Sequence, residues 1–237
     1  MSIWLNYLVL ALILLAGITY SIAARKLTVV AALTGAAVAC AVFAGGGFTG
    51  LTMMTVFFIL GSAATSWQLK TKQKINAEEK ERRTAWQVLA NAGTGGVCGI
   101  LVPFFPDHIL LFQLMMAAGF ASATADTLSS ELGIVYGRRF FNIITFKTDT
   151  KGLDGVISIE GTLIGVGGAA VIAAVFFIGH GWSANLLWII VAGTLGNIAD
   201  SVLGALLERK GIIGNNMVNF LNTLAAALFM LLFYLIS

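Results

Sequence analysis

Charge is scarce in this chain: 11% of its 237 residues are Asp, Glu, Lys or Arg, whereas 58% are apolar. A soluble domain of this length needs more polar surface to meet water, so a water-soluble globular fold is excluded. Cysteine and histidine are also scarce, with two of each. Cys40 and Cys98 lie in apolar runs without the spacing of a disulfide or metal motif, and His108 and His180 each stand alone. This pattern argues against a cysteine or histidine metal site.

Long apolar runs are abundant. About 20 apolar residues cross a bilayer as one helix, and eight runs of this kind follow one another. The expected spans are 3–22, 27–44, 51–66, 84–102, 108–125, 156–178, 184–207 and 217–236. The first run lacks the basic start and small-residue cleavage site of a signal peptide, so we expect it to be retained. The sequence predicts an all-α, polytopic transmembrane bundle that forms a single domain over residues 1–237.

Lysine and arginine are missing from alternate loops. All fourteen fall in four groups, and eight spans place every group on one side of the membrane. Loops rich in Lys and Arg face the cytoplasm, so we expect both termini outside the cytoplasmic membrane. Cytoplasmic loops are expected at about 67–83, 126–155 and 208–216. Residues 126–146 are too polar at their start and too short for a predicted span, so an interfacial or re-entrant helix is expected there. The expected number of spans is about eight, or seven if one segment is re-entrant.

One acidic cluster surrounds Asp126. If the segment is helical, Glu131 lies about 140° away from Asp126 around the helix axis. The two carboxylates would therefore converge only if the helix breaks near Gly133. The face of Asp126 also carries three hydroxyl side chains, Ser122, Ser129 and Ser130.

A second acidic cluster, around Asn197 and Asp200, repeats the Ala-Asp-Ser/Thr-aliphatic pattern of the first. The repeat is short and suggests a parallel duplication, with chance as the alternative. An ionisable side chain within a membrane costs several kcal/mol unless it faces a cavity or a partner. Both clusters are therefore candidates for the functional site.

Residues 147–162 form a third cluster, in which Lys147, Lys151, Asp154 and Glu160 alternate with glycines. A Gly-rich turn that enters a helix presents free backbone N–H groups and the positive end of the helix dipole, which suits phosphate. The G-x-x-x-x-G-K-[ST] spacing is missing, so this segment is not a P-loop. The alternative is an ordinary loop in which Asp154 caps the next helix.

Asparagines line two of the predicted spans. In the last span Asn215, Asn219 and Asn222 follow at i, i+4 and i+7, and Asn91 begins a similar face in the fourth. Uncharged amides either hold helices together or contact a ligand. The sequence leaves both interpretations open.

Carboxylates, lysines and Gly-rich turns at a membrane boundary have a combined use. Carboxylates ligate Mg²⁺, lysines and backbone N–H groups bind phosphate, and an apolar cleft can hold a lipid tail. Phosphoryl transfer depends mainly on such positioning. The alternative is a transporter that uses the acids for a cation or a proton, although transporter sites usually lie at the midplane between inverted repeats. Nothing in the sequence predicts a nucleic-acid partner.

Four segments support a family resemblance. They are Asn91-Ala-Gly-Thr-Gly, Ala125-Asp126-Thr127…Glu131-Leu-Gly133, Gly152…Gly155-Val…Glu160-Gly161-Thr162 and Gly196-Asn197…Asp200-Ser201…Gly204. With these segments in this order, the chain from about Leu27 onward resembles an integral membrane family long described as a domain of unknown function. That family includes the phytyl-phosphate kinase of tocopherol synthesis and a vertebrate multispan membrane protein.

The resemblance implies transfer of the terminal phosphate of a nucleoside triphosphate, with CTP as the expected donor, to an isoprenyl monophosphate at the cytoplasmic face. It implies catalytic roles for Asp126, Glu131 and Asp200, and it adds Glu160 to these three as ligands of Mg²⁺. Substrate and nucleotide contacts are expected from seven further residues: Asn91, Lys147, Lys151, Asp154, Asn197, Asn219 and Asn222. A homodimer is left open.

Overall fold

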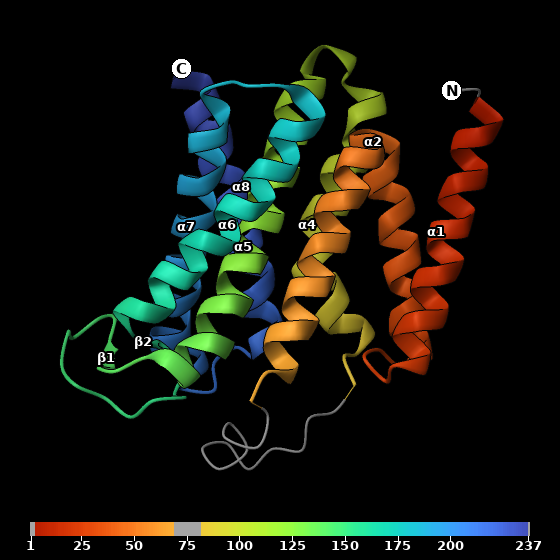
Figure 1. Cartoon of the computed structure of the whole chain (residues 1–237). Coiled ribbons are helices and arrows are strands. Elements are labelled where there is room, and N and C mark those ends of the chain that lie inside the picture. The colour runs from red at the N-terminus through yellow and green to blue at the C-terminus, as the bar shows by residue number, and fades with distance from the viewer. Residues whose placement is uncertain (1–2, 69–81, 237) are drawn as a thin grey trace.

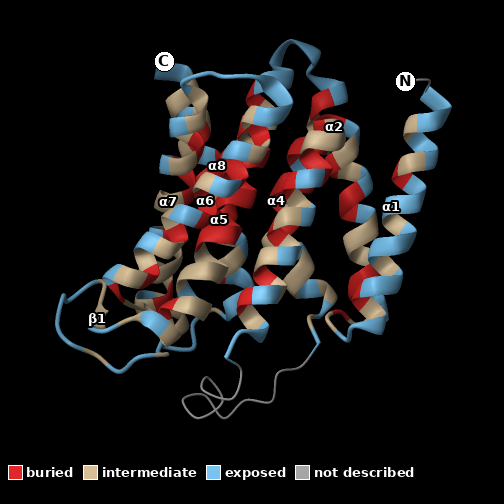
Figure 2. Cartoon of the chain, viewed as in Figure 1, coloured by how far each residue is buried: buried red, intermediate tan, exposed pale blue. Residues whose placement is uncertain are grey.

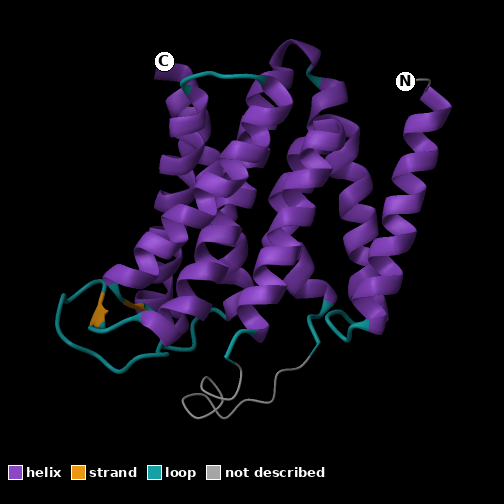
Figure 3. Cartoon of the chain, viewed as in Figure 1, coloured by secondary structure: helices purple, strands orange, loops and turns teal. Residues whose placement is uncertain are grey.

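The computed structural model describes residues 3–68 and 82–236. Within these ranges, seven helical segments are long and apolar enough to cross a membrane, which confirms the predicted all-α, polytopic bundle (Figures 1 and 3). The helices are α1 (Ile3–Ala23), α2 (Val29–Ser66), α4 (Ala85–Leu101), α5 (Ile109–Tyr136), α6 (Ile159–His180), α7 (Asn185–Leu203) and α8 (Asn215–Ile236). Shorter elements are two 3-10 turns (Val102–Phe104 and Pro106–His108), a π-helical turn (Gly204–Glu208) and strands β1 (Phe141–Asn142) and β2 (Val156–Ile157).

Helix α2 is a hairpin of two antiparallel segments rather than one rod. Its 38 residues would extend about 57 Å as a single helix, nearly twice the roughly 30 Å hydrocarbon core of a bilayer. Gly47 has φ 56° and ψ −149°, a backbone conformation that favours glycine, and Figure 1 shows the chain turning back there. The Lys26 ammonium, just before the first segment, donates a 2.7 Å hydrogen bond to the Ser66 hydroxyl at the end of the second. All eight expected apolar runs therefore lie in helical segments of the described chain, two of them in the two arms of α2.

Helix α5 is longer than the sequence predicted, and the expected loop 126–155 is wrong at its start. The helix continues through Asp126 to Tyr136, so residues 126–136 are not an interfacial or re-entrant segment. Some polar side chains of this part contact other helices. Ser129, for example, donates a 3.2 Å hydrogen bond to Asn197 Oδ1 on α7. Asp126 consequently lies ten residues, or about 15 Å, before the end of its helix.

The core lies around α5, which packs against α2, α4, α6, α7 and α8. Figure 2 shows buried residues concentrated on α5 and on the helix faces turned toward it. The largest fully buried side chains include Phe120, Leu114, Met116, Ile172, Ile189 and Met230. Glycines allow the close approaches: a methyl group on Gly99 would overlap the carbonyl oxygen of Ala41, and one on Gly161 would be 2.9 Å from the carbonyl oxygen of Ser129. These glycines thus act as packing surfaces between helices.

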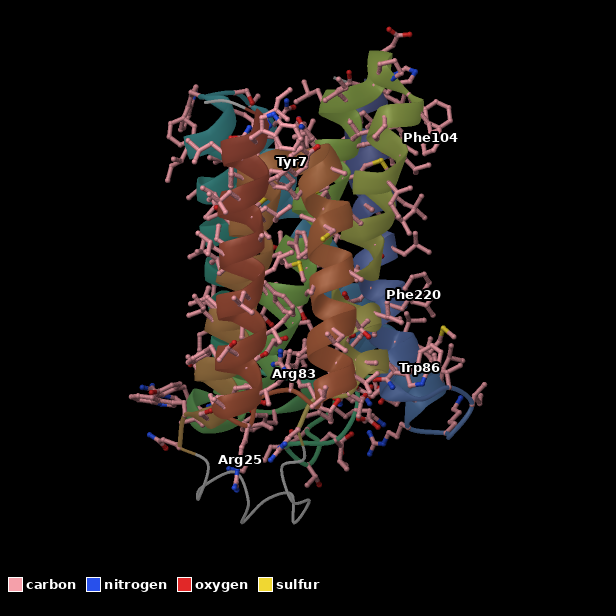
Figure 4. All side chains as sticks on the ribbon, turned by 90° about the vertical axis from the view of Figure 1, so that its right-hand side faces the viewer. Tyr7, Arg25, Arg83, Trp86, Phe104 and Phe220 are labelled. Atoms are coloured by element: carbon pink, nitrogen blue, oxygen red, sulfur yellow. The ribbon has the colours of Figure 1, made fainter. Side chains whose placement is uncertain are left out.

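The two termini lie at one end of the bundle, and the loops that carry the described lysines and arginines lie at the other (Figure 1). We call the latter the basic end; Figure 4 labels Arg25 there. His108 and His180 are at the opposite end, far from the acidic clusters. Residues 69–81 of the predicted loop 67–83 lie outside the described residues. The cytoplasmic location of the basic end stays a prediction.

Candidate functional site

Asp126 on α5 and Asp200 on α7 meet in the half of the bundle nearer the basic end. Their carboxyl groups lie within hydrogen-bonding distance of each other, and we call them the acid pair. Two carboxyl groups this close need a shared proton or a bound cation between their oxygens. Asn222 Nδ2 on α8 donates a 2.7 Å hydrogen bond to Asp200 Oδ1. Three helices therefore bring one polar group each to the same point.

Buried amides and hydroxyls hold the acid pair in place. Ser122 Oγ donates a 3.1 Å hydrogen bond to Asn222 Oδ1, which turns the amide nitrogen of Asn222 toward Asp200. Ser129 Oγ donates to Asn197 Oδ1, so α5 is tied to both α7 and α8. Asn197 and Asn222, which were predicted to contact the substrates, are buried and belong to this polar network. Fixed partners of this kind orient a charged site before a ligand binds.

A row of further polar groups leads from the acid pair toward the basic end. Glu208, in the π-helical turn after α7, interacts electrostatically with Asp200 and Asp154 and accepts a hydrogen bond from the Asn215 side chain. The segment before β2 is docked there, because a methyl group on Gly204 would be 3.0 Å from the backbone nitrogen of Gly155. Glu208 was not among the predicted site residues. Asn219 is one turn farther along α8 and donates to Asn215 Oδ1 at 3.1 Å.

Arg83 lies at the end of the expected loop 67–83, and its guanidinium interacts electrostatically with Glu131 on α5. Arg83 is half-buried there: Arg83 N donates to Lys26 O at 3.0 Å, and Arg83 O accepts from Thr28 N at 3.1 Å. Burial lowers the pKa of the Arg83 guanidinium, and the charge of Glu131 opposes that effect. The group still carries its proton, as arginine does in proteins.

The negative charge of Glu131 acts on the guanidinium of Arg83 and on the carboxyl group of Asp126. Gly61 of α2 shows how near Arg83 is to α5: a methyl group there would be 3.3 Å from Arg83 Nη2 and 3.4 Å from Thr127 Cγ2. A signal for Arg83 was present in the sequence. The Thr84-x-x-Gln87 capping box starts α4 immediately after it and fixes its place at a helix end.

Residues 11–227 match the family described as Integral membrane protein DUF92. The chain belongs to this family. The match begins in α1, earlier than the expected start at about Leu27. No solved structure matches the chain.

Three DUF92 relatives illustrate the similarity. An uncharacterized membrane protein of Methanocaldococcus jannaschii is 37% identical over 188 residues, which cover 79% of this chain and 77% of that protein. Protein VTE6, chloroplastic, of Arabidopsis thaliana is 30% identical over 185 residues, 74% of this chain and 56% of that protein. An uncharacterized membrane protein of Synechocystis is 30% identical over 194 residues, with 78% and 74% covered.

The four acids predicted as Mg²⁺ ligands do not come together in this DUF92 protein. Among residues 3–68 and 82–236, no group of three or more Asp, Glu, His or Cys side chains could hold a metal ion. Glu160 accepts instead from the backbone N–H of Arg138 at 3.3 Å. The acid pair alone suits an ion that arrives with a nucleotide, because Mg²⁺ is usually bound by one or two carboxylates plus substrate phosphates.

The predicted phosphate-binding lysines lie on the surface of the loop that joins α5 to α6. In this DUF92 chain Phe141 pairs with Ile157 and Asn142 with Val156 in the β1–β2 ladder. Lys147 and Lys151 are exposed, and the Lys151 ammonium is 6.0 Å from the centre of the Phe140 ring. From there they can attract an anion toward the basic end, a role that acts at long range. Asn91 of α4 lies apart from the acid pair and donates to Gln87 O at 2.9 Å.

An ion pair anchors this loop to the α7–α8 connection of the DUF92 fold. Arg209 Nη1 donates to Asp149 Oδ2 at 2.6 Å, and that contact lowers the pKa of Asp149. The pair is therefore complete at neutral pH and is lost as the pH falls through the lowered pKa, below the ordinary Asp range near about 4.

We expect Asp149→Asn to loosen the loop at neutral pH without unfolding the helices. Backbone amides of residues 140–156 should exchange with deuterium about threefold faster, a modest change because exposed ion pairs contribute little. Hydrogen–deuterium exchange in detergent measures this effect. Asp107→Asn, an exposed acid at the opposite end, is the control, and equal exchange in both variants would show that the ion pair does not hold the loop.

Proposed function

We propose that this protein is a membrane-embedded kinase that transfers the terminal phosphoryl group of a nucleoside triphosphate, with CTP as the expected donor, to an isoprenyl monophosphate. The observation that carries the proposal is the acid pair, which Asn222 holds and on which the charge of Glu131 acts. The motif resemblance to a family that includes phytyl-phosphate kinase supports it. So does the 30% identity to protein VTE6.

The chemistry asks for positioning and charge neutralisation. An oxygen of the lipid phosphate attacks the γ-phosphorus, the bond from that phosphorus to the β–γ bridging oxygen breaks, and the nucleoside diphosphate leaves. The attacking oxygen is already ionised, so the reaction needs no general base. When bound, Mg²⁺ would offset the negative charge of the phosphates. Asp126 and Asp200 would hold the donor through that ion, and Asn222 and Asn197 keep the acids oriented.

A cation- or proton-coupled transporter is the second candidate, for one specific reason. The acid pair lies about 15 Å inside the end of α5, deeper than the sequence predicted, and intramembrane acids also mark ion pathways. The site lies between α5, α7 and α8. A transporter would have to open this contact toward both ends of the bundle in turn.

The test is a phosphorylation assay. Purified protein in detergent receives Mg²⁺, a radiolabelled isoprenyl monophosphate and either CTP, ATP, GTP or UTP. We expect a labelled isoprenyl diphosphate, formed fastest with CTP, and unchanged activity in the remote variant Asp107→Asn. If a protein with an intact helical circular dichroism spectrum gives no diphosphate with any nucleotide, the kinase proposal is wrong. Flux measurements in liposomes would then test the transporter.

A further inference from the structure

A cleft of about 430 Å³ lies between α1, both segments of α2 and α4. This volume falls within the range of about 300–1,000 Å³ that is typical of small-molecule sites. Most of the wall is apolar and includes Leu14, Met54 and Phe58. Figure 4 faces this side of the molecule and shows Arg83 between the ribbons of α1 and α2, toward the basic end. The cleft thus runs beside the lipid-facing helix α1 and has a polar end.

The polar end is formed by the residue before the N-cap of α4 and by the first turns of that helix. Arg83, Gln87 and Asn91 all line the cleft and follow one another at intervals of four residues. Among the described residues of the lining, Arg83 is the single charged side chain. A guanidinium at the end of an apolar channel is complementary to a phosphate on a hydrocarbon tail, because arginine binds phosphate through paired hydrogen bonds.

We propose that this cleft binds the lipid substrate: the hydrocarbon chain of a single-chain lipid monophosphate lies between α1, α2 and α4, and its phosphate pairs with Arg83. The identity of the lipid as the phosphate acceptor rests on the proposed function. The location rests on the cleft and its charge. Glu131 links the two parts of the site, since its charge acts on Arg83 on one side and on Asp126 on the other.

A second cleft, of about 540 Å³, lies on the other side of α4, against α2 and α8. Its lining includes Trp86 and Phe220, both labelled in Figure 4. In the part of the chain that the structure describes, no charged side chain lines it. An apolar tail could lie in either cleft, but a phosphate finds a counter-charge only at Arg83. The second cleft therefore serves as an internal control.

A photoreactive ligand locates the lipid directly. The probe is farnesyl monophosphate with a diazirine at the end of the chain far from the phosphate, added to the purified protein in detergent and irradiated. We expect mass spectrometry to find the adducts on wall residues of the first cleft, such as Leu14 and Met54. Adducts confined to the second cleft, around Trp86 and Phe220, would overturn the assignment.

Two pairs of variants test the phosphate and the tail separately. Arg83→Gln should weaken probe binding about tenfold through loss of a charge-assisted contact, whereas Arg82→Gln, at an exposed neighbouring arginine, should not. Gly17→Phe should fill the first cleft and Gly93→Phe the second; an added Cβ meets nothing within 4 Å at either glycine. We expect reduced labelling in Gly17→Phe alone. Equal labelling of Arg83→Gln and Arg82→Gln would refute the phosphate contact. Equal labelling of the two glycine variants would refute the position of the tail.

Competitors establish the class of lipid. Unlabelled farnesyl monophosphate should displace the probe, whereas inorganic phosphate and two-chain phosphatidic acid should not at equal concentration. Displacement by inorganic phosphate alone would make this a phosphate site rather than a lipid site. The two proposals fail differently: labelling of the first cleft that depends on Arg83, without diphosphate formation, leaves the lipid site standing and removes the kinase. Diphosphate formation with labelling outside the first cleft would support the kinase and remove the lipid site.

Discussion

Under the proposed kinase function, we expect replacement of Asp126 or Asp200 by asparagine to lower the rate of isoprenyl diphosphate formation by about 100-fold or more, the usual loss when a preorganised electrostatic group is removed from an active site. Each substitution keeps the side-chain shape but removes one of the two charges that would hold a nucleotide-bound cation. The new amide at position 126 can donate a hydrogen bond to Asp200, so the contact between α5 and α7 survives. Initial rates at saturating nucleotide and lipid measure the effect.

The double variant sharpens this test. Residues that act as one unit are not additive, so changing both aspartates should cost about as much as changing one. Asp107→Asn, at an exposed acid beyond the opposite end of the bundle, is the matched control and should retain full activity. If Asp126→Asn and Asp200→Asn both keep more than half of the wild-type rate, the acid pair is not the reaction site.

Gly196→Leu separates the three helices of the site. Even a methyl group added at this position of α7 would overlap Ser122 Oγ and would be 2.8 Å from the carbonyl oxygen of Asn222. Because backbone cannot yield as a flexible side chain does, α7 must move away from α8, and Asp200 then loses its contact with Asn222. Overpacking of this kind costs about 1–3 kcal/mol or more. We expect a lower melting temperature in detergent and a loss of activity.

Gly167→Leu is the control for this substitution. Gly167 is exposed on α6, and an added Cβ meets nothing within 4 Å. The same side chain at the same kind of helical position should therefore leave the thermal transition unchanged. Identical melting curves for Gly196→Leu and the wild type would mean that α5, α7 and α8 do not pack as described.

The crossings could be predicted because each one depends on length and apolarity, which are local properties of the sequence. The end of α5 could not. Ser129, Ser130 and Glu131 argue against a lipid-facing helix, but α5 packs against five neighbours, and Ser129 finds a hydrogen-bond partner on α7. A rule for lipid-facing helices fails at the central helix of a bundle. The small residues around Gly119 were the available sign that this helix is central.

The members of the site were easier to predict than their grouping. Asp126, Asp200, Asn197 and Asn222 were recognised individually, and the structure joins them. The helical wheel correctly separated Glu131 from the acid pair, since α5 does not break near Gly133. The family resemblance implied that Glu160 binds the same ions, yet its carboxylate accepts a hydrogen bond from the backbone N–H of Arg138. Distance across helices cannot be read from the order of motifs.

The packing above the acid pair has a consequence for the cell. Toward the end of the bundle opposite the basic end, large apolar side chains fill the space between the helices, among them Leu114, Met116, Phe120 and Met230. Under the kinase proposal, we expect packing of this kind to keep the permeability barrier intact although two acids lie within the membrane. Vesicles that contain the protein should then hold an imposed pH gradient as long as empty ones do, whereas a proton-coupled transporter would dissipate it.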